Sequence, residues 1–566
     1  MNDRRLAFRS LSGLVALALV AALATPAQAA VTFVINNVDG AGVGFNDPTP
    51  KAPVGGNPGT TLGQQRLIAF QFAADTWGSI LDSDVTVVIQ ATFFPAGTSF
   101  GALGCTATAA TLGAAGTIQI FANFPGADFA NTWYHSSLAN KLAGFDLTPG
   151  PLDPGFQVPP FNDDIVALFN DRIDDPVCLG PRSWYYGLDN NHGTDLSLVH
   201  VLWHEFAHGL GFSNFVNEST GGTPLGLPVY GVFSKDNTTG LHWNQMTAAQ
   251  LATSALNCDN VVWDGPNATA KSPLFLGIGT PAVTINSPGS LAGIFRAGAA
   301  AFGPPISAPG VTRDIVLVND GVVGSPGGTL SDGCETPFVN AAAIAGKIAL
   351  VDRGLCGFIN KAANAEAAGA AGVIIANNAA GCPPPGLAGT GLPITIPTGS
   401  ITLPQAIAIK AALGSGTVNG TLGLNGSRRA GADAANHVQL FAANPVQPGS
   451  SISHWDTLAF PNLLMEPAIN ADLDFGVDLT AYQLQDIGWT LATVGIDGCD
   501  SGVPNLVLPG GGTILTLIEQ CAAGAGNHGQ FVSCVSHAMN TLKKAGLISG
   551  SQKGAIQSCA AQADIP

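Results

Sequence analysis

With 566 residues, the chain is too long for a single hydrophobic core, and two to four domains are expected. Charged residues make up only 10% of it, and the formal net charge of -17 comes from scarce Lys and Arg rather than from acidic runs. This balance argues against nucleic acids and anionic membranes as partners and favours a soluble protein.

The first 29 residues have the pattern of a secretory signal peptide. Three arginines precede an apolar run, 11–23, and Ala27-Gln28-Ala29 supplies a small-residue cleavage site. The run is too short for a membrane span, and no later segment is long and apolar enough to be one. We therefore expect an exported protein, secreted or periplasmic, without a membrane span.

Ten cysteines in an exported chain predict disulfide bonds. None belongs to a C-x-x-C pair, so a cysteine metal site is not expected. The last four lie in the C-terminal segment 493–566 and are expected to pair with one another, although the sequence does not give the connectivity. The cysteines are Cys105, Cys178, Cys258, Cys334, Cys356, Cys382, Cys499, Cys521, Cys534 and Cys559.

The N-terminal half contains the first strong secondary-structure signals. Residues 62–81 have helical apolar spacing, and residues 85–94 (VTVVIQATFF) form a β-branched run typical of a strand. Residues 164–170 predict a further strand. We expect the strand at 85–94 to pair with an extended substrate, as an edge strand can.

Residues 196–211 predict a buried helix that carries the sequence HEFAH. Apolar residues recur along it at helical spacing, and Asp195 or Ser197 is available to cap its start. Residues four apart share one helix face, so the imidazoles of His204 and His208 can reach one cation, with Glu205 beside the metal-bound water. The alternative is a helix whose histidines are merely packed.

Two histidines do not make a catalytic zinc site, which needs a third protein ligand. In the metzincin pattern HExxHxxGxxH a third histidine follows a glycine. Here Gly211 is in place, but the third histidine is replaced by Asn214, a poor zinc ligand. Glu218 follows too closely for the glutamate of a thermolysin-like site. His200 precedes the motif by one turn and is expected to pack or to support the site.

The segment 453–467, SHWDTLAFPNLLMEP, resembles the part of leishmanolysin-type metalloproteases that carries the third zinc histidine and the Met-turn. The upstream HExxHxxGFS and the long insertion after it are similar to that family as well. The resemblance implies that His454 is the third ligand and that Met465 forms a hydrophobic base beneath the metal. His242, also followed by Trp, is the competing candidate, but no Met-turn follows it. Glu466-Pro467 after the methionine departs from the family pattern.

The block 346–378 reads as strand, helix and strand and resembles the protease-associated (PA) domain. The resemblance implies a non-catalytic domain that covers or orients the approach to an active site, and a passive spacer is the alternative. The matching features are Val351-Asp352-Arg353-Gly354, Cys356 with Phe358, the Ala-rich helix 361–371 and the strand 373–378.

Two acidic loops, 189–195 (DNNHGTD) and 472–478 (DLDFGVD), are candidates for structural calcium, and solvated loops are the alternative. Past Trp489, residues 495–512 read as a linker. Segments 515–518 and 531–545 are expected to be helices of a disulfide-bearing tail.

The predicted fold class is α+β. A metzincin-like zinc protease domain, with a twisted sheet and an active-site helix, is interrupted by an α/β PA domain and followed by a small helical disulfide-bearing module. The expected organisation is a signal peptide at 1–29, the protease domain at 30–271 and 431–492, the PA domain at 272–430, and a linker with the C-terminal module at 493–566.

The expected function is that of a secreted zinc endopeptidase acting on proteins or peptides. Zinc held by His204, His208 and His454 would activate a water, and Glu205 would serve as general base and then return the proton to the leaving amine. The rival hypothesis is an inactive metalloprotease-like protein that binds or adheres through its PA domain. The sequence predicts no nucleic-acid partner and leaves the oligomeric state open.

Overall fold

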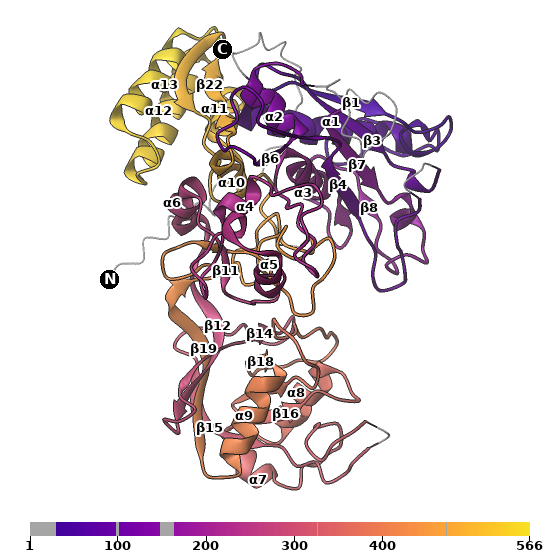
Figure 1. The fold of residues 1–566 in the computed structure, drawn as a ribbon, viewed down its shortest axis with the longest axis vertical. Coiled ribbons are helices and arrows are strands. Elements are labelled where there is room, and N and C mark those ends of the chain that lie inside the picture. Colours follow the sequence, from indigo (N-terminus) through magenta and orange to yellow (C-terminus); the bar gives the residue numbers. More distant parts are fainter. Residues whose placement is uncertain (1–29, 98–100, 148–162, 325–326, 471, 566) are drawn as a thin grey trace.

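The computed structural model describes residues 30–97, 101–147, 163–324, 327–470 and 472–565. The expected signal peptide, residues 1–29, lies outside the described residues. Within the described ranges, no helix has the length and apolar character needed to cross a bilayer. The inserted segment and the C-terminal tail lie at opposite ends of a central body (Figure 1).

The chain on both sides of the insertion builds the hydrophobic core of the central body, which draws on residues from Val31 to Leu276 and from Ala432 to Val507. A four-stranded sheet in the order β1-β3-β7-β4 packs with two long helices, and β4 runs antiparallel to β7. These elements are β1 (Phe33–Asn37), α1 (Leu62–Ile80), β3 (Val87–Thr92), β4 (Gly113–Thr117), β7 (Ile165–Phe169) and α3 (Leu198–Leu210).

Helix α1 and strands β3 and β7 fall where the sequence predicts them, but β3 is not an edge strand. It pairs in parallel with β1 on one side and with β7 on the other, so the prediction that it pairs with substrate is wrong. A continuous β-branched run is typical of a strand buried on both faces. The edge strands are β1 and β4, and the sequence of β4, GAAGT, has little strand propensity.

Shorter elements complete the central body. They are β2 (Leu81–Asp82), β5 (Ile120–Ala122), β6 (Trp133–His135), α2 (Ser136–Ala143), β8 (Trp184–Tyr185), β9 (Leu196–Ser197), α4 (Tyr230–Phe233), β10 (Ser234–Asp236), α5 (Ala248–Ser254), β11 (Val261–Trp263), α6 (Pro266–Phe275), β20 (Val438–Gln439), α10 (Thr480–Asp486) and β21 (Thr490–Leu491).

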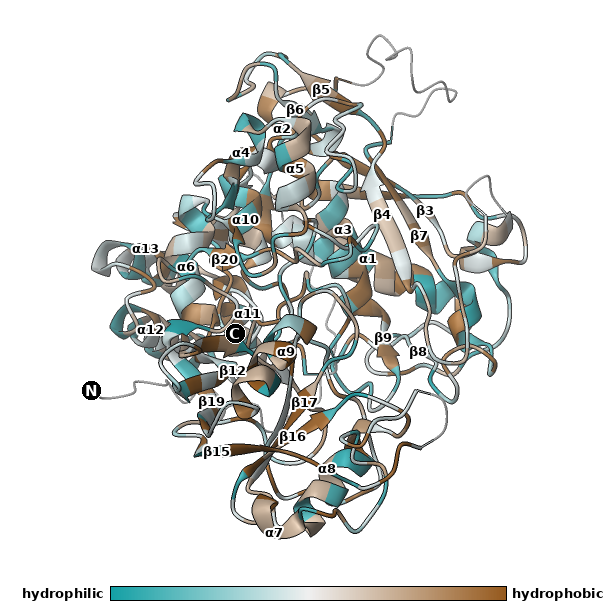
Figure 2. Ribbon diagram, turned by 60° about the horizontal axis from the view of Figure 1, so that its bottom comes forward, coloured by the Kyte–Doolittle hydropathy of each residue, from teal (hydrophilic) through white to brown (hydrophobic). Residues whose placement is uncertain are grey.

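The insertion enters along β12 and leaves along β19, which pair antiparallel over most of their length. An eight-stranded sheet in the order β13-β12-β19-β15-β16-β17-β18-β14 has an apolar cluster on each face. Figure 2 shows β16 and β17 in hydrophobic colours beside α8 and α9. The elements are β12 (Ile278–Ser287), β13 (Gly293–Arg296), β14 (Gly298–Ala299), β15 (Val311–Leu317), α7 (Ala341–Ile344), β16 (Ile348–Asp352), α8 (Phe358–Ala367), β17 (Gly372–Ala376), β18 (Thr398–Ile401), α9 (Leu403–Leu413) and β19 (Val418–Arg429).

The predicted strand, helix and strand of the insertion are β16, α8 and β17, and the two strands pair in parallel. The helix begins and ends earlier than expected. The chain turns back at Gly369, where φ is +83°, a conformation that glycine adopts without strain.

The C-terminal tail begins with a β-hairpin and has its own core. β22 (Thr493–Ile496) and β23 (Cys499–Pro504) are joined by Asp497-Gly498, both at positive φ, so much of the expected linker is folded. Helix α11 (Ile514–Gly524) includes the predicted segment 515–518, and α12 (His528–Lys544) covers the predicted segment 531–545 except its last residue. Helix α13 (Gly550–Gln562) was not predicted.

All ten cysteines form disulfides. As expected, the last four pair with one another. A further bond joins the central body to the insertion, at Cys258 and Cys382. The five pairs are Cys105–Cys178, Cys258–Cys382, Cys334–Cys356, Cys499–Cys559 and Cys521–Cys534.

Candidate metal centre

Helix α3 carries two of the three candidate ligands. The side chain of Ser197 accepts a hydrogen bond from the backbone N–H of His200 and caps the first turn, as one of the two expected caps. The helix ends at Gly211, where φ is +131°. It is buried throughout, and the indole N–H of Trp77 on α1 donates to its backbone at Trp203.

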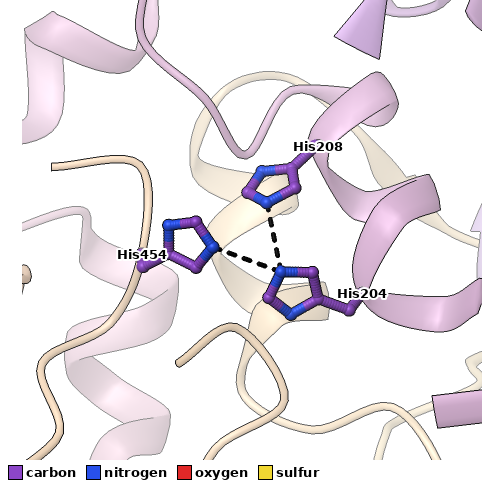
Figure 3. A group of neighbouring side chains, drawn as sticks. All are labelled: His204, His208 and His454. Atoms are coloured by element: carbon purple, nitrogen blue, oxygen red, sulfur yellow. Dashed lines mark hydrogen bonds between the residues drawn. The ribbon is translucent and has the colours of Figure 1, made fainter. Parts of the chain in front are cut away.

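Three imidazoles from two distant parts of the chain lie close together (Figure 3). His204 and His208 project from α3, and His454 comes from the chain that returns after the insertion. The Nε2 atom of His204 lies 3.2 Å from the Nε2 atoms of both other rings. All three side chains are buried.

Backbone carbonyls fix the tautomer of each ring. The Nδ1 atom of His204 lies 2.8 Å from the Leu464 carbonyl, that of His208 2.7 Å from Phe212, and that of His454 2.9 Å from Ser450. A carbonyl oxygen only accepts, so each Nδ1 carries the proton. The three Nε2 lone pairs then face one another with no proton to share.

This arrangement fits a zinc ion. Tetrahedral zinc with Zn–N bonds of 2.0–2.1 Å holds its nitrogen ligands about 3.3 Å apart, close to the two short separations. Burial lowers the pKa of His204 to about 4 and that of His208 to about 3, and it lowers the pKa of His454 as well. The rings are thus neutral near pH 7, as metal ligands must be.

Glu205 lies on α3 beside the first of these ligands and is buried. Burial raises the pKa of its carboxyl to about 8, and a hydrogen bond with the backbone of Ala115 on β4 opposes that rise. A cation at the three imidazoles would further favour the ionised form. The carboxyl is therefore suited to exchange a proton near neutral pH.

The strand β4 packs closely on this carboxylate. A Cβ atom at Gly113 would come within 3.1 Å of the Cγ atom of Glu205 and of the ring of Phe169. The absence of a side chain at Gly113 is therefore explained by the contact with Glu205, and β4 places a free sheet edge along the candidate site.

The other candidate ligands lie elsewhere. The amide of Asn214 donates to Glu218 and to the hydroxyl of Ser453. His242 is paired with Asp264, 2.9 Å away. His200 donates to the carbonyl of Asp474 and packs edge-on against aromatic rings, in keeping with the packing role expected for it.

Met465 is fully buried and follows His454 in the sequence. Its carbonyl accepts a hydrogen bond from the N–H of Trp455, 2.8 Å away, so it lies in the turn that backs His454. The Trp455 ring packs against Phe212, 4.7 Å between centroids, and so joins this turn to the chain that follows α3.

Within the described residues, neither acidic loop proposed for calcium brings three ligand side chains together. In the first loop, Asp189 bonds Tyr185 and Asn191, and in the second, Asp478 accepts from Leu464 and Thr480. The side chains of these loops are used for local structure.

Sequence reasoning missed the roles of several residues that support the site. These are the β4 residues that border Glu205, the Asn214–Ser453 contact that ties α3 to the third ligand, and Glu466, whose carboxylate accepts from the N–H of Leu463. The asparagine was visible in the motif but was read as a missing ligand.

A protein-family model described as PA domain matches residues 311–409. The match confirms the resemblance of the inserted segment, and the chain contains a PA domain. No curated protein matches the chain.

Solved structures that resemble the chain include a zinc aminopeptidase, BSAP, from Bacillus subtilis, at 23% identity and a TM-score of 0.20 over 28% of this chain and 35% of that one. An aminopeptidase from Aneurinibacillus sp. strain AM-1 has 20% identity and a TM-score of 0.19 over 35% and 42%. A peptidase M28 precursor from Shewanella amazonensis SB2B has 22% identity and a TM-score of 0.19 over 28% and 40%. The chain thus spans less than half of each, and likenesses of this size carry no argument about the three imidazoles.

Proposed function

We propose that the protein is a zinc metallopeptidase whose metal is held by His204, His208 and His454, with Glu205 as general base. The observation that supports this most is the convergence of three neutral Nε2 lone pairs, each fixed by a carbonyl behind its ring. A catalytic zinc site has three protein ligands and leaves one position for water or substrate.

Zinc bound there would supply a Lewis acid for the scissile carbonyl and lower the pKa of water. The protein's own contribution is the carboxylate of Glu205, which takes a proton from the attacking water and delivers it to the nitrogen of the leaving amine. Its hydrogen bond with Ala115 holds the carboxylate in position for both transfers.

We further propose that the enzyme is an endopeptidase of the metzincin type. The edge strand β4 can pair with an extended peptide by backbone hydrogen bonds, which need no free peptide terminus. The metzincin assignment is supported by the HExxH helix and by the turn that carries Met465 behind His454.

The protein is proposed to be secreted and to act on proteins or peptides. The disulfides are those of an oxidising compartment. In this proposal the PA domain is tied to the central body by the disulfide between Cys258 and Cys382, and it covers or orients the approach to the site.

The rival hypothesis, an inactive binding protein, is tested with internally quenched peptides that are acetylated at the N-terminus and amidated at the C-terminus. The zinc-loaded wild type should cleave them internally, and Glu205→Ala should retain zinc but lose most of the activity. A wild type that holds zinc and leaves both blocked and free peptides intact would favour the rival. Cleavage of free peptides alone would exclude the endopeptidase.

A further inference from the structure

A cavity of about 370 Å³ opens beside the three imidazoles. Its wall includes the ring of His208, the β4 residue Ala115, and Ser453, which directly precedes His454. Much of the remaining wall is the loop that follows α3, residues 213–218. A group bound in the cavity therefore lies next to the candidate metal centre.

The cavity carries one negative charge. Glu218 is the one acid among the described residues that line it, and none of them is Lys or Arg. Within the described part of the chain, its carboxylate has one hydrogen-bond partner, the side-chain amide of Asn214, 2.9 Å away. An amide orients a carboxylate without neutralising it, so the charge remains available to a ligand.

Asn214 fixes this carboxylate relative to the third imidazole. Its amide nitrogen also donates to the hydroxyl of Ser453, 3.0 Å away, and its amide oxygen accepts from the N–H of Val216, 2.7 Å away. The residue that replaces a histidine of the metzincin pattern thus connects Glu218 to the segment that carries His454.

The same loop supplies apolar residues to the cavity wall. Phe215 and Val216 both line it, and the ring of Phe215 packs against that of His135, with 4.8 Å between centroids. An apolar surface with one carboxylate suits a side chain that has a methylene stem and a cationic head.

We propose that this cavity binds a cation of the substrate, with Glu218 as its counter-charge, and that the cation is the head group of a Lys or Arg side chain next to the scissile bond. This inference rests on the proposed function, since it names the substrates of that site. The N-terminal ammonium of a peptide offers the same chemistry, and the experiment separates the two sources.

The test uses blocked peptides that differ only in one residue flanking the scissile bond, which is Lys, norleucine or Glu. The wild type should cleave the Lys peptide with a higher kcat/KM than the norleucine peptide. Glu218→Gln, which keeps the hydrogen bond from Asn214, should reduce the ratio of these two kcat/KM values at least fivefold. Glu218→Lys should favour the Glu peptide. The exposed acid Asp75 on α1 gives the matched control, Asp75→Asn, which should keep the wild-type ratio.

A second measurement is independent of turnover. Zinc-loaded Glu205→Ala should bind the Lys peptide more tightly than the norleucine peptide, and the double variant with Glu218→Gln should not. The same comparison with free and acetylated N-termini shows whether the N-terminal ammonium is the cation. If the wild type holds zinc but cleaves no peptide, the proposed function fails, and the binding data still decide this inference. Equal binding of all peptides, or a Lys preference that survives Glu218→Gln, would overturn it.

Discussion

The guanidinium of Arg296, on β13 of the insertion, bonds both carboxylate oxygens of Asp456, two residues beyond His454 in the central body. The Nη2 atom lies 2.7 Å from Oδ1 and the Nη1 atom 3.2 Å from Oδ2. Asp456 is 2% exposed. Because its only described cationic partner belongs to the insertion, docking of the inserted segment stabilises the turn that carries the third imidazole.

Replacing this arginine should weaken both the fold and the metal site. Arg296→Met leaves a buried carboxylate unpaired, which costs about 3 kcal/mol or more of unfolding free energy. We expect a lower urea midpoint and looser zinc binding in chelator competition, with partial recovery in Arg296→Lys. Arg313→Met, on the exposed face of β15, is the matched control. A variant Arg296→Met as stable as the control would mean that the pair does not stabilise this turn.

The buried carboxyl of Glu466 predicts a pH-dependent stability. Burial raises its pKa from 4.5 to about 8, so the folded protein binds the proton more tightly than the unfolded chain. The stabilisation of the folded protein by this proton is fully present below pH 4.5 and is lost as the pH rises toward 8. Glu466→Gln, which keeps the acceptor for Leu463, should therefore gain stability relative to wild type at pH 8.5 but not at pH 4.5.

Urea denaturation of both proteins at the two pH values measures this difference. The protonation of His204, His208 and His454 is common to both proteins and cancels in the comparison. An unfolding free energy that changes with pH in the same way in the wild type and in Glu466→Gln would show that the carboxyl of Glu466 does not cause the change.

The close contact of β4 with Glu205, the proposed general base, predicts that one added methyl group at Gly113 lowers activity. Gly113→Ala forces the new Cβ against Glu205 and should lower kcat while zinc remains bound. Gly116→Ala, on the same strand, meets nothing within 4 Å and controls for the effect of alanine on the stability of β4. Unchanged kcat in Gly113→Ala would mean that the contact with β4 does not hold the carboxylate of Glu205 in a position that the reaction needs.

The disulfide between Cys258 and Cys382 closes a loop with a sequence separation of 124 residues. Its loss in the double alanine variant should cost about 2–5 kcal/mol through the entropy of the unfolded chain. Calorimetry should show a lower Tm, and zinc binding should weaken if docking of the insertion supports the turn at His454. Retention of the wild-type Tm would show that contacts such as Arg296–Asp456 suffice without the bond.

Local patterns predicted the parts of the structure that depend on neighbouring residues. Helix α3 follows from the spacing of its apolar residues and from its caps. β16, α8 and β17 follow from an apolar run, an Ala-rich segment and a second apolar run. The position of His454 could be expected only from a resemblance, because 250 residues separate it from His204. The spacing of residues alone did not decide which of several histidines would be the third ligand.

The features that the sequence did not reveal depend on long-range contacts. The strand β4 consists of small residues with little strand propensity, and at Gly113 a glycine is favoured because a side chain there would contact Glu205. The pairing of Arg296 with Asp456 joins the insertion to the central body and leaves no local signal in the sequence. The hairpin at Asp497-Gly498, in contrast, has a recognisable turn signal that was read as part of a linker.

Zinc stoichiometry and affinity in the wild type, His454→Ala and His242→Ala test the central claim most directly. We expect one tightly bound zinc per chain in the wild type and in His242→Ala, and loss of tight binding in His454→Ala. Wild-type zinc binding in His454→Ala, or loss of zinc in His242→Ala, would contradict a site made by His204, His208 and His454.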